Sequence, residues 1–175
     1  DHRSEGELLK LLSHADRRIR QEAQFALAEK DAIPALTKMA ASRDHQLARI
    51  HAIWALGQIH RRKKSVTLPL RALLEDPDAE IRAQTMKWLG DAQQLDGVPD
   101  VGVRRYTSTF LLRGLQDENP RVRFFSAIGL GKAGLAESLD PLLAMLDENN
   151  NTDPWLRHAG VMGLTDIGQR DAASL

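Results

Sequence analysis

A pattern of six positions recurs five times along this chain of 175 residues. An arginine marks each copy, and successive arginines lie 29, 33, 41 and 34 residues apart. The five arginines are Arg20, Arg49, Arg82, Arg123 and Arg157. An apolar residue directly precedes each of them, a small residue follows three positions later, and a leucine follows seven positions later. Repetition at this interval is typical of proteins built from stacked structural units, so it constrains the fold before any other feature.

Each copy has the pattern of a helix with one apolar face. The apolar, small and leucine positions at −1, +3 and +7 share one side of a helix that has 3.6 residues per turn. Four or five residues ahead of each arginine lies an Asp or Asn, such as Asp16, Asp78 or Asn119, which can cap the first turn. A second apolar segment precedes each such helix, for example Leu8–Leu12 and Leu139–Leu146. The repeating unit is therefore predicted to be a pair of helices joined by a short turn.

One helix pair leaves an apolar face uncovered, and stacking the pairs buries it. Aromatic residues make up only 5% of the chain and no alternating β-branched run occurs, so strands are not expected. We predict an all-α fold and a single domain over residues 1–175. Its repeats are expected at residues 4–30, 31–62, 65–93, 103–134 and 137–168, with a further helix beginning at 169–175. Because a bare last pair would expose apolar surface, we also expect a fragment of a longer protein.

The segment Asp76–Gly90, D-P-D-A-E-I-R-A-Q-T-M-K-W-L-G, resembles the second helix of a HEAT repeat, and Val122–Gly131 follows the same pattern. The resemblance extends over nearly the whole chain in five units. It implies a right-handed α–α superhelix of the HEAT/armadillo type, an α-solenoid of about five helix pairs. In such a solenoid the second helices line the concave side. The stretch Gln94–Arg105, which lengthens one interval, is expected to be an inserted surface loop.

A narrower resemblance concerns Arg49–Gln58, Asn119–Lys132 and Asp153–Leu164. These segments look like the HEAT region of large exported bacterial proteins, which join a propeller-type dehydrogenase-like region to a c-type haem module. The resemblance implies an alternative function, a spacer in an exported or periplasmic redox protein. The chain contains no cysteine and hence no C-x-x-C-H haem-attachment motif, so any redox chemistry would lie outside this segment.

Composition and missing motifs argue against several classes of function. Lys plus Arg and Asp plus Glu both number 24, whereas proteins that bind nucleic acid electrostatically carry a basic excess. A DNA-handling HEAT-like protein is therefore the disfavoured third interpretation. H-E-x-x-H, Gly-x-Ser-x-Gly and glycine-rich phosphate loops are absent from the sequence, so we expect no enzyme activity, metal or cofactor. No apolar run reaches the roughly 18–20 residues that a membrane helix needs.

The five arginines have two interpretations. They could bind a linear acidic or phosphate-bearing ligand, because guanidinium groups pair well with such anions. They could instead each pair with the Asp cap of their own or the adjacent repeat and so order the turns. The balanced charge of the chain favours this structural pairing. The basic run Arg61–Lys64 is expected to be a solvated loop, with contact to a phosphate or an acidic partner as the alternative.

A stripe of side chains at positions +1 and +5 of the second helices is the best candidate for function. These positions normally face solvent, yet most of the stripe is apolar. Its candidate partner-binding members are Phe25, Ile50, Trp54, Lys87, Phe124, Ile128 and Met162. Exposed apolar patches often mark interaction surfaces, although tight curvature could also pack these side chains internally. We therefore predict a non-enzymatic scaffold whose concave face binds a protein or a neighbouring domain of the same chain, with the oligomeric state left open.

Overall fold

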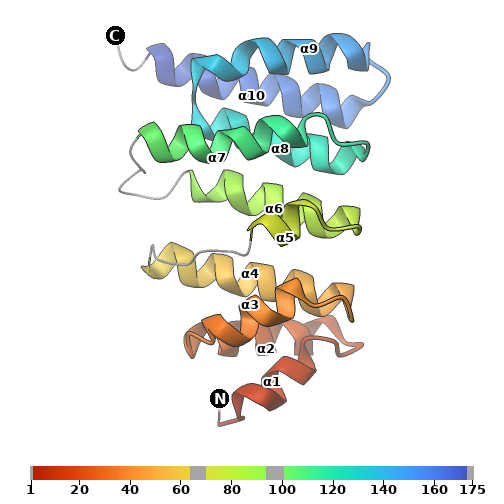
Figure 1. The fold of residues 1–175 in the computed structure, drawn as a ribbon, viewed down its shortest axis with the longest axis vertical. Helices are drawn as coiled ribbons and strands as arrows, with labels where there is room; N and C mark the ends of the chain where they lie inside the picture. The colour runs from red at the N-terminus through yellow and green to blue at the C-terminus, as the bar shows by residue number, and fades with distance from the viewer. Residues whose placement is uncertain (1, 64–69, 94–100, 173–175) are drawn as a thin grey trace. The chain divides into compact units, whose positions relative to one another are not determined.

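The computed structural model describes residues 2–63, 70–93 and 101–172, except the side chains of residues 70–71 and 170–172. All regular secondary structure in these ranges is helical, which confirms the predicted all-α class. Figure 1 shows the succession of helices along the chain. The chain divides into two compact units, Asp1–Asp76 and Pro77–Leu175. The boundary falls inside the repeat predicted at 65–93, and the single domain stays a prediction.

The first unit contains five helices that pack mainly as neighbours in sequence. They are α1 (Glu5–Leu11), α2 (Arg17–Glu29), α3 (Ile33–Ala41), α4 (Gln46–Lys63) and α5 (Leu70–Leu74). The helices α1 and α2 pack together as one pair, and α3 and α4 as the next. The second helices of these two pairs, α2 and α4, also lie against each other (Figure 1). Pairing within a repeat and stacking between second helices are the contacts that the repeat predicts.

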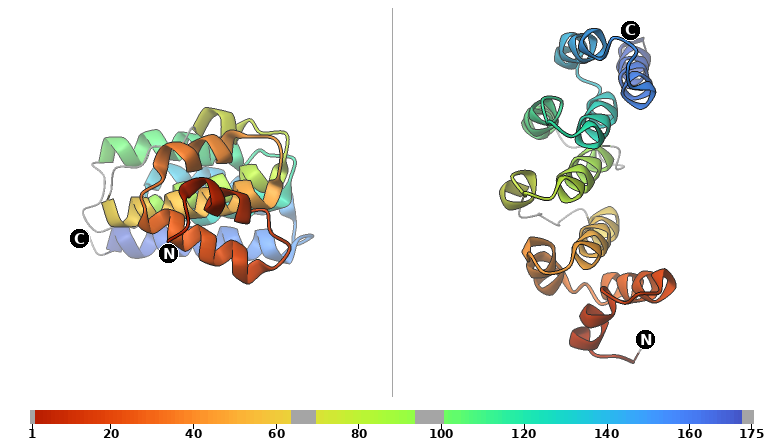
Figure 2. Two further views of the ribbon diagram at one scale, coloured as in Figure 1. Left: turned by 90° about the horizontal axis from the view of Figure 1, so that it is seen from below. Right: turned by 90° about the vertical axis from the view of Figure 1, so that its right-hand side faces the viewer.

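The second unit has the same arrangement. Its elements are α6 (Ala79–Ala92), α7 (Val101–Gly114), α8 (Pro120–Ala133), a 3-10 turn η1 (Ala136–Ser138), α9 (Leu139–Asn149) and α10 (Pro154–Ala172). The helices α6, α8 and α10 stack in one layer, while α7 packs on α8 and α9 packs on α10 (Figure 2). The layer of second helices therefore carries the arginines and the candidate stripe in this unit.

Polar caps fix where the second helices begin. The side-chain oxygens of Asp16, Asp78 and Asn119 each accept a hydrogen bond from the backbone N–H two residues later, at 2.9, 2.9 and 3.0 Å. Asp153 does the same for α10, accepting from the Trp155 N–H at 2.8 Å. Each cap satisfies an N–H group that has no partner inside the helix, which stabilises a helix by about 1 kcal/mol. These four predicted caps are confirmed.

The leucines that occupy the same position in successive repeats lie mostly in the interior. Leu27, Leu56, Leu89 and Leu130, which follow their arginines by seven residues, are fully buried. Burying one such side chain contributes about 1.5–3 kcal/mol relative to leaving it exposed. Leu164, the fifth member, is only partly buried.

Glycines let the backbones of the second helices in the second unit approach closely. A Cβ atom added at Gly131 of α8 would lie 2.7 Å from the Cα of Gly163 in α10. A Cβ atom at Gly90 of α6 would lie equally close, 2.7 Å, to the Cα of Gly129 in α8. Both distances are shorter than any real contact of a Cβ atom. The separation between α6, α8 and α10 therefore depends on these positions having no side chain.

Two predicted boundaries are wrong. Val101–Arg105 belong to α7 and not to an inserted loop, and the Arg104 guanidinium donates a 3.0 Å hydrogen bond to the Ala133 carbonyl, which anchors this first part of the helix. The rest of the expected loop, residues 94–100, lies outside the described residues. At the other end, Gln169–Ala172 extend α10 instead of beginning a further helix. Gly168 meets nothing within 4 Å, and a single glycine does not by itself stop a helix.

We predict that Gly131→Ala lowers the free energy of unfolding by about 1–2 kcal/mol. Overpacking costs about 1–3 kcal/mol, and the better helix propensity of alanine offsets up to about 1 kcal/mol of that. Gly168→Ala is the matched control in open space and is expected to stabilise the protein by about 0.5–1 kcal/mol. Urea unfolding of both variants measures the difference. Equal effects at the two positions would show that α8 and α10 do not require the glycine contact.

Candidate protein-binding surface

Two of the repeating arginines form ion pairs with an aspartate of the following turn. The side chains of Arg49 and Asp76 are 5% and 6% exposed, and Nη1 of Arg49 donates to Oδ1 of Asp76 at 3.2 Å. In the second unit, Nε and Nη2 of Arg82 donate to the two oxygens of Asp117 at 2.8 and 2.9 Å. Arg49 and Arg82 therefore pair within the chain with Asp76 and Asp117, which are not the cap residues.

The acceptors Asp76 and Asp117 each lie two residues ahead of the cap residue. The cap residues Asp78 and Asn119 instead each accept the first free N–H of their own helix. The residue two positions earlier lies in the turn, where it reaches the arginine of the preceding second helix. This turn position, and not the cap, carries the acidic half of each pair.

Among the described residues, the other three arginines have no ion pair with an aspartate of a turn. Nη1 of Arg20 donates to the carbonyls of His14 and Ala15 at 2.7 and 2.9 Å. Nη1 of Arg123 lies 3.4 Å from Oε1 of Glu148, which is mostly exposed. The exposed Arg157 has only a long hydrogen bond, 3.5 Å, to the side chain of Asn151. Since Arg20, Arg49 and Arg82 are largely buried and already have partners, they do not form a free surface for an anionic ligand.

The basic run at the end of α4 is also partly neutralised. The carboxylate of Asp31 pairs with Arg62 and, at 2.5 Å, with Nζ of Lys63. The hydrogen bond from Lys63 lowers the pKa of Asp31 and keeps it charged. Arg62 also donates to the Ala28 carbonyl at 2.7 Å. Lys64 lies outside the described residues. The run therefore ties the end of α4 to the turn after α2. Arg61–Lys63 form the last turn of α4, so the predicted solvated loop is wrong for these residues.

A neutral histidine holds the polar contact between α2 and α4. Nε2 of His51 accepts a hydrogen bond from Nε of Arg20 at 3.2 Å, so Nδ1 carries the proton and donates to Oε1 of Gln24 at 2.7 Å. Burial, and to a smaller extent the charge of Arg20, lower the pKa of His51 from 6.5 to about 4. The ring of Trp54 packs edge-on against His51 with centroids 5.1 Å apart. This contact positions Trp54 at the surface.

The members of the candidate stripe differ in exposure. Phe25, Trp54 and Met162 are 38%, 41% and 39% exposed, and Phe124 and Ile128 are partly buried. The structure thus leaves three aromatic or apolar side chains of the stripe open to solvent. Their role as a binding surface stays a prediction.

Two stripe residues are less available than the pattern suggests. Ile50 is only 7% exposed, so the expectation that it faces solvent is wrong. It lies near the start of α4, where the adjacent Ala48 and Arg49 are buried as well and α2 and α3 both pack against the helix. Lys87 is half-exposed, but its Nζ lies 2.5 Å from the carboxylate of Asp91, which holds it along α6.

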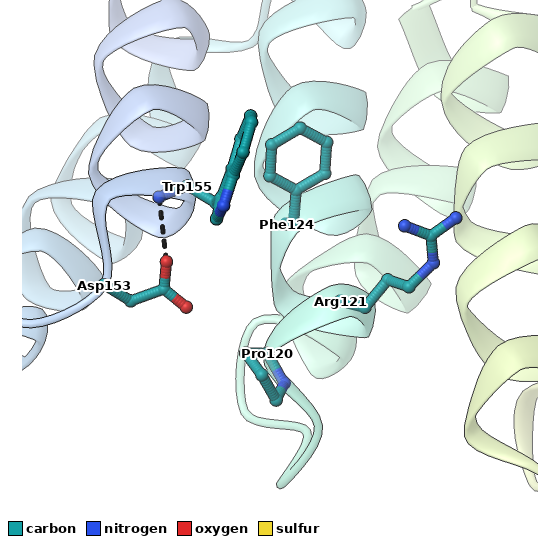
Figure 3. A pocket seen from close by; sticks show the side chains of 5 residues that line it. All are labelled: Pro120, Arg121, Phe124, Asp153 and Trp155. Atoms are coloured by element: carbon teal, nitrogen blue, oxygen red, sulfur yellow. Dashed lines mark hydrogen bonds between the residues drawn. The ribbon is translucent and has the colours of Figure 1, made fainter.

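A pocket that the sequence analysis missed opens between the first turns of α8 and α10. Its volume is about 370 Å³, and it is lined by Pro120, Arg121, Phe124, Asp153 and Trp155 (Figure 3). Trp155 is 71% exposed, the largest value among the exposed large hydrophobic residues of the described chain. Two aromatic rings and a proline make most of the lining apolar.

The turn before α10 explains why Trp155 lies at the surface. Asn149 fixes the turn by exchanging two hydrogen bonds with the backbone of Asp153, at 2.9 and 3.1 Å. Oδ1 of Asp153 then accepts from the N–H groups of Trp155 and Leu156. Trp155 precedes its repeat arginine by two residues, a position occupied in the other repeats by Arg18, Leu47, Glu80 and Arg121. A tryptophan where other repeats mostly place a charged residue was the available sequence signal.

Arg121 lines the pocket but is engaged on its other side. Its Nε lies 2.7 Å from Oε2 of Glu80 in α6, and its guanidinium carbon is 5.0 Å from the ring centroid of Phe125. Figure 3 shows the Arg121 side chain directed away from Trp155. The apolar part of the pocket is therefore left to Phe124, Trp155 and Pro120.

The described residues contain no group of three or more His, Asp or Glu side chains placed to hold a metal ion. Over those residues, no helix combines the length and hydropathy needed to span a bilayer.

Comparisons with known proteins agree with this geometry. The pattern of HEAT repeats matches residues 6–90 and 66–165. One similar solved structure is an engineered protein with 19% identity and a TM-score of 0.59, covering 93% of this chain and 78% of that one. Another is a designed armadillo repeat protein in complex with the peptide (KR)4, with 16% identity, a TM-score of 0.61 and coverage of 91% and 80%. No curated protein matches the chain. At these identities the structural likeness shows the fold, an α-solenoid.

We predict that stability depends on pH through His51. The unfolded chain protonates this ring near pH 6.5, whereas the folded protein protonates it only near pH 4, so stability is full above about pH 6.5 and falls as the pH drops toward 4. Between pH 7.5 and 5 the loss should approach about 2 kcal/mol, and His51→Gln should remove this part of the pH dependence. Urea unfolding at both pH values tests this. An identical pH response in the variant would contradict a neutral buried His51.

We further predict that Arg49→Met lowers the free energy of unfolding by about 3–5 kcal/mol, because it leaves the Asp76 carboxylate buried without its cation. The double change Arg49→Met with Asp76→Leu should recover most of the loss, since apolar replacement of both partners is often close to neutral. Arg157→Met is the exposed control, expected to cost less than about 1 kcal/mol. Thermal and urea unfolding distinguish these outcomes; a similar cost at positions 49 and 157 would overturn the pairing.

Proposed function

Since the chain belongs to the HEAT-repeat family, we propose that it is a non-enzymatic scaffold that binds a protein partner along its second helices. The observation that carries this proposal is Trp155, a tryptophan that is 71% exposed beside a largely apolar pocket. Aromatic side chains of this kind commonly dominate the binding energy of protein interfaces. A tryptophan ring that stays in water contributes nothing to the stability of the fold. Its exposure therefore favours a role in binding.

The surface we assign to the partner is defined separately in each unit. In the first unit it contains Phe25 of α2 and Trp54 of α4. In the second unit it contains the Trp155 pocket together with Phe124 and Met162. All of these side chains lie on second helices, which the family resemblance assigns to the concave side of the solenoid. A rigid row of helices presents them with little loss of conformational entropy on binding.

A structural neighbour supports the kind of ligand. The designed armadillo repeat protein is in complex with a peptide of eight alternating basic residues, (KR)4. A stack of helix pairs presents parallel second helices at regular intervals, which suits an extended chain lying across them. We therefore infer an extended peptide segment of another protein as the form of the partner.

A phage-displayed peptide library tests the proposal without knowledge of the natural partner. We expect the immobilised protein to enrich peptides with dissociation constants in the micromolar range, and Trp155→Ser to weaken them about tenfold or more. Leu143→Ser, which changes a residue that is 52% exposed on the first helix α9, is the matched control and should leave binding unchanged. Melting temperatures of both variants should stay near that of the parent protein.

The proposal fails if no peptide is enriched above background. It also fails if the enriched peptides bind Trp155→Ser and the parent protein equally, because the exposed ring would then not be an anchor.

A further inference from the structure

We infer that the pocket beside Trp155 is a subsite for the cationic side chain of a lysine or arginine in the partner segment. The inference rests on the proposed function, because it assigns a chemistry to one position of the same surface. The pocket joins two aromatic rings, those of Trp155 and Phe124, to a carboxylate, that of Asp153 (Figure 3). An apolar wall with a negative charge at one end complements a long aliphatic stem that ends in a positive charge.

The carboxylate of Asp153 has one oxygen to offer. Oδ1 accepts the N–H groups of Trp155 and Leu156 at 2.8 and 3.2 Å. Oδ2 accepts no hydrogen bond from any described residue, and Figure 3 shows it turned toward the pocket. Capping the helix therefore holds the carboxylate in a fixed orientation while leaving half of its hydrogen-bonding capacity for a ligand. A charge-assisted hydrogen bond from an ammonium or guanidinium group would satisfy it.

The aromatic rings provide the second contact. Trp155 is 71% exposed, so the face of its indole is open, and Phe124 stands beside it across the pocket (Figure 3). A cation over the face of a tryptophan is attracted by the electrons of the ring, more strongly than over tyrosine or phenylalanine. The stem of a lysine or arginine also covers apolar surface while its charged end stays near water. Both features match the two rings and the carboxylate.

The cations already present near the pocket do not occupy it. Arg121 is paired with Glu80 and directed away from Trp155. The guanidinium of Arg157 lies at the turn before α10, 3.5 Å from Oδ1 of Asn151. The described surroundings therefore do not supply an internal cation to Oδ2 of Asp153, which leaves the site to a partner.

An anionic ligand is the opposite possibility, because the first turns of α8 and α10 both lie at the pocket. A helix N-terminus carries about half a positive charge. At α10 the full negative charge of Asp153 exceeds that half charge and would repel an anion. At α8 the first residue is Pro120, which has no N–H to donate. The balance of charge at the pocket therefore favours a cation.

The experiment uses an eight-residue peptide of alternating Lys and Gly, with alternating Gln–Gly and Glu–Gly peptides of the same length as controls. Each peptide carries a fluorescent label, and its anisotropy is followed during titration with the full chain. The chain has equal numbers of acidic and basic residues, so attraction of the basic peptide by overall charge is small. We expect the Lys–Gly peptide to bind and the other two to bind at least about fivefold more weakly.

Three variants locate the binding. Asp153→Asn keeps an N-cap of equal quality but removes the charge, and should weaken the Lys–Gly peptide about tenfold. Trp155→Leu should weaken it by a similar factor. Glu118→Gln is the matched control, because Glu118 is 92% exposed in the turn before α8 and does not line the pocket. It should bind as the parent protein does, and circular dichroism should show the same helicity for all three variants.

Two results would overturn the inference. One is that Asp153→Asn binds the Lys–Gly peptide as tightly as the parent protein does, and the other is that the Glu–Gly peptide binds better than the Lys–Gly peptide. If the library peptides still require Trp155 in that case, the proposed protein-binding function holds and only the cationic subsite is rejected. If neither kind of peptide binds, both proposals fail.

Discussion

The close packing of second helices is the constraint on which the rest of the second unit depends. At Gly131 and Gly163 the backbones of α8 and α10 are so near that a single methyl group does not fit. Leu89 and Leu130, which follow their arginines by seven residues, are fully buried in the same unit. In the second unit the turns that precede α8 and α10 lie within the helix pairs. Asp117, the two caps and the Trp155 pocket lie on those turns or on the helices that follow them.

The arginine–aspartate pairs act on the same turns. Arg82 of α6 binds Asp117, and Asn119, two residues later, caps α8. The short turn before α8 is therefore held by both α6 and α8. Where the acidic residue is missing, as before α10, Asn149 takes over the bracing of the turn through its own hydrogen bonds. The turn that carries Trp155 is thus ordered by different chemistry from the others. It is also the turn beside which the pocket opens.

Most of the architecture could be predicted from the sequence, because the same pattern occurs five times and its copies can be aligned with one another. The buried leucines and the four caps follow from helical periodicity and from the hydrogen-bonding needs of a helix end. The partners of the arginines could not be predicted this way. Periodicity says which side of a helix a residue occupies, but not whether a side chain reaches the cap or the residue two positions before it.

The candidate site was predicted less well for a related reason. A stripe defined by two positions per helix treats all repeats as equal, but Ile50 is buried whereas Met162 is 39% exposed. For the same reason the stripe does not include Trp155, which lies about one helical turn ahead of the first stripe position of α10. Residues that depart from the repeat carry more information about function than residues that follow it. Trp155 and Asn151 are the clearest departures in this chain.

The direction of the arginine–aspartate pairs has an evolutionary consequence. Each pair joins an arginine of one second helix to an acidic residue just ahead of the next, as in Arg49 with Asp76 and Arg82 with Asp117. A duplicated segment that begins ahead of the acid and ends after the arginine brings both halves, so the junctions on either side of the new copy are complete. A segment of one repeat that is cut at any other point also carries one arginine and one acid. Gain or loss of a whole repeat therefore keeps every pair, whereas insertion of part of a repeat leaves one charged residue unpaired.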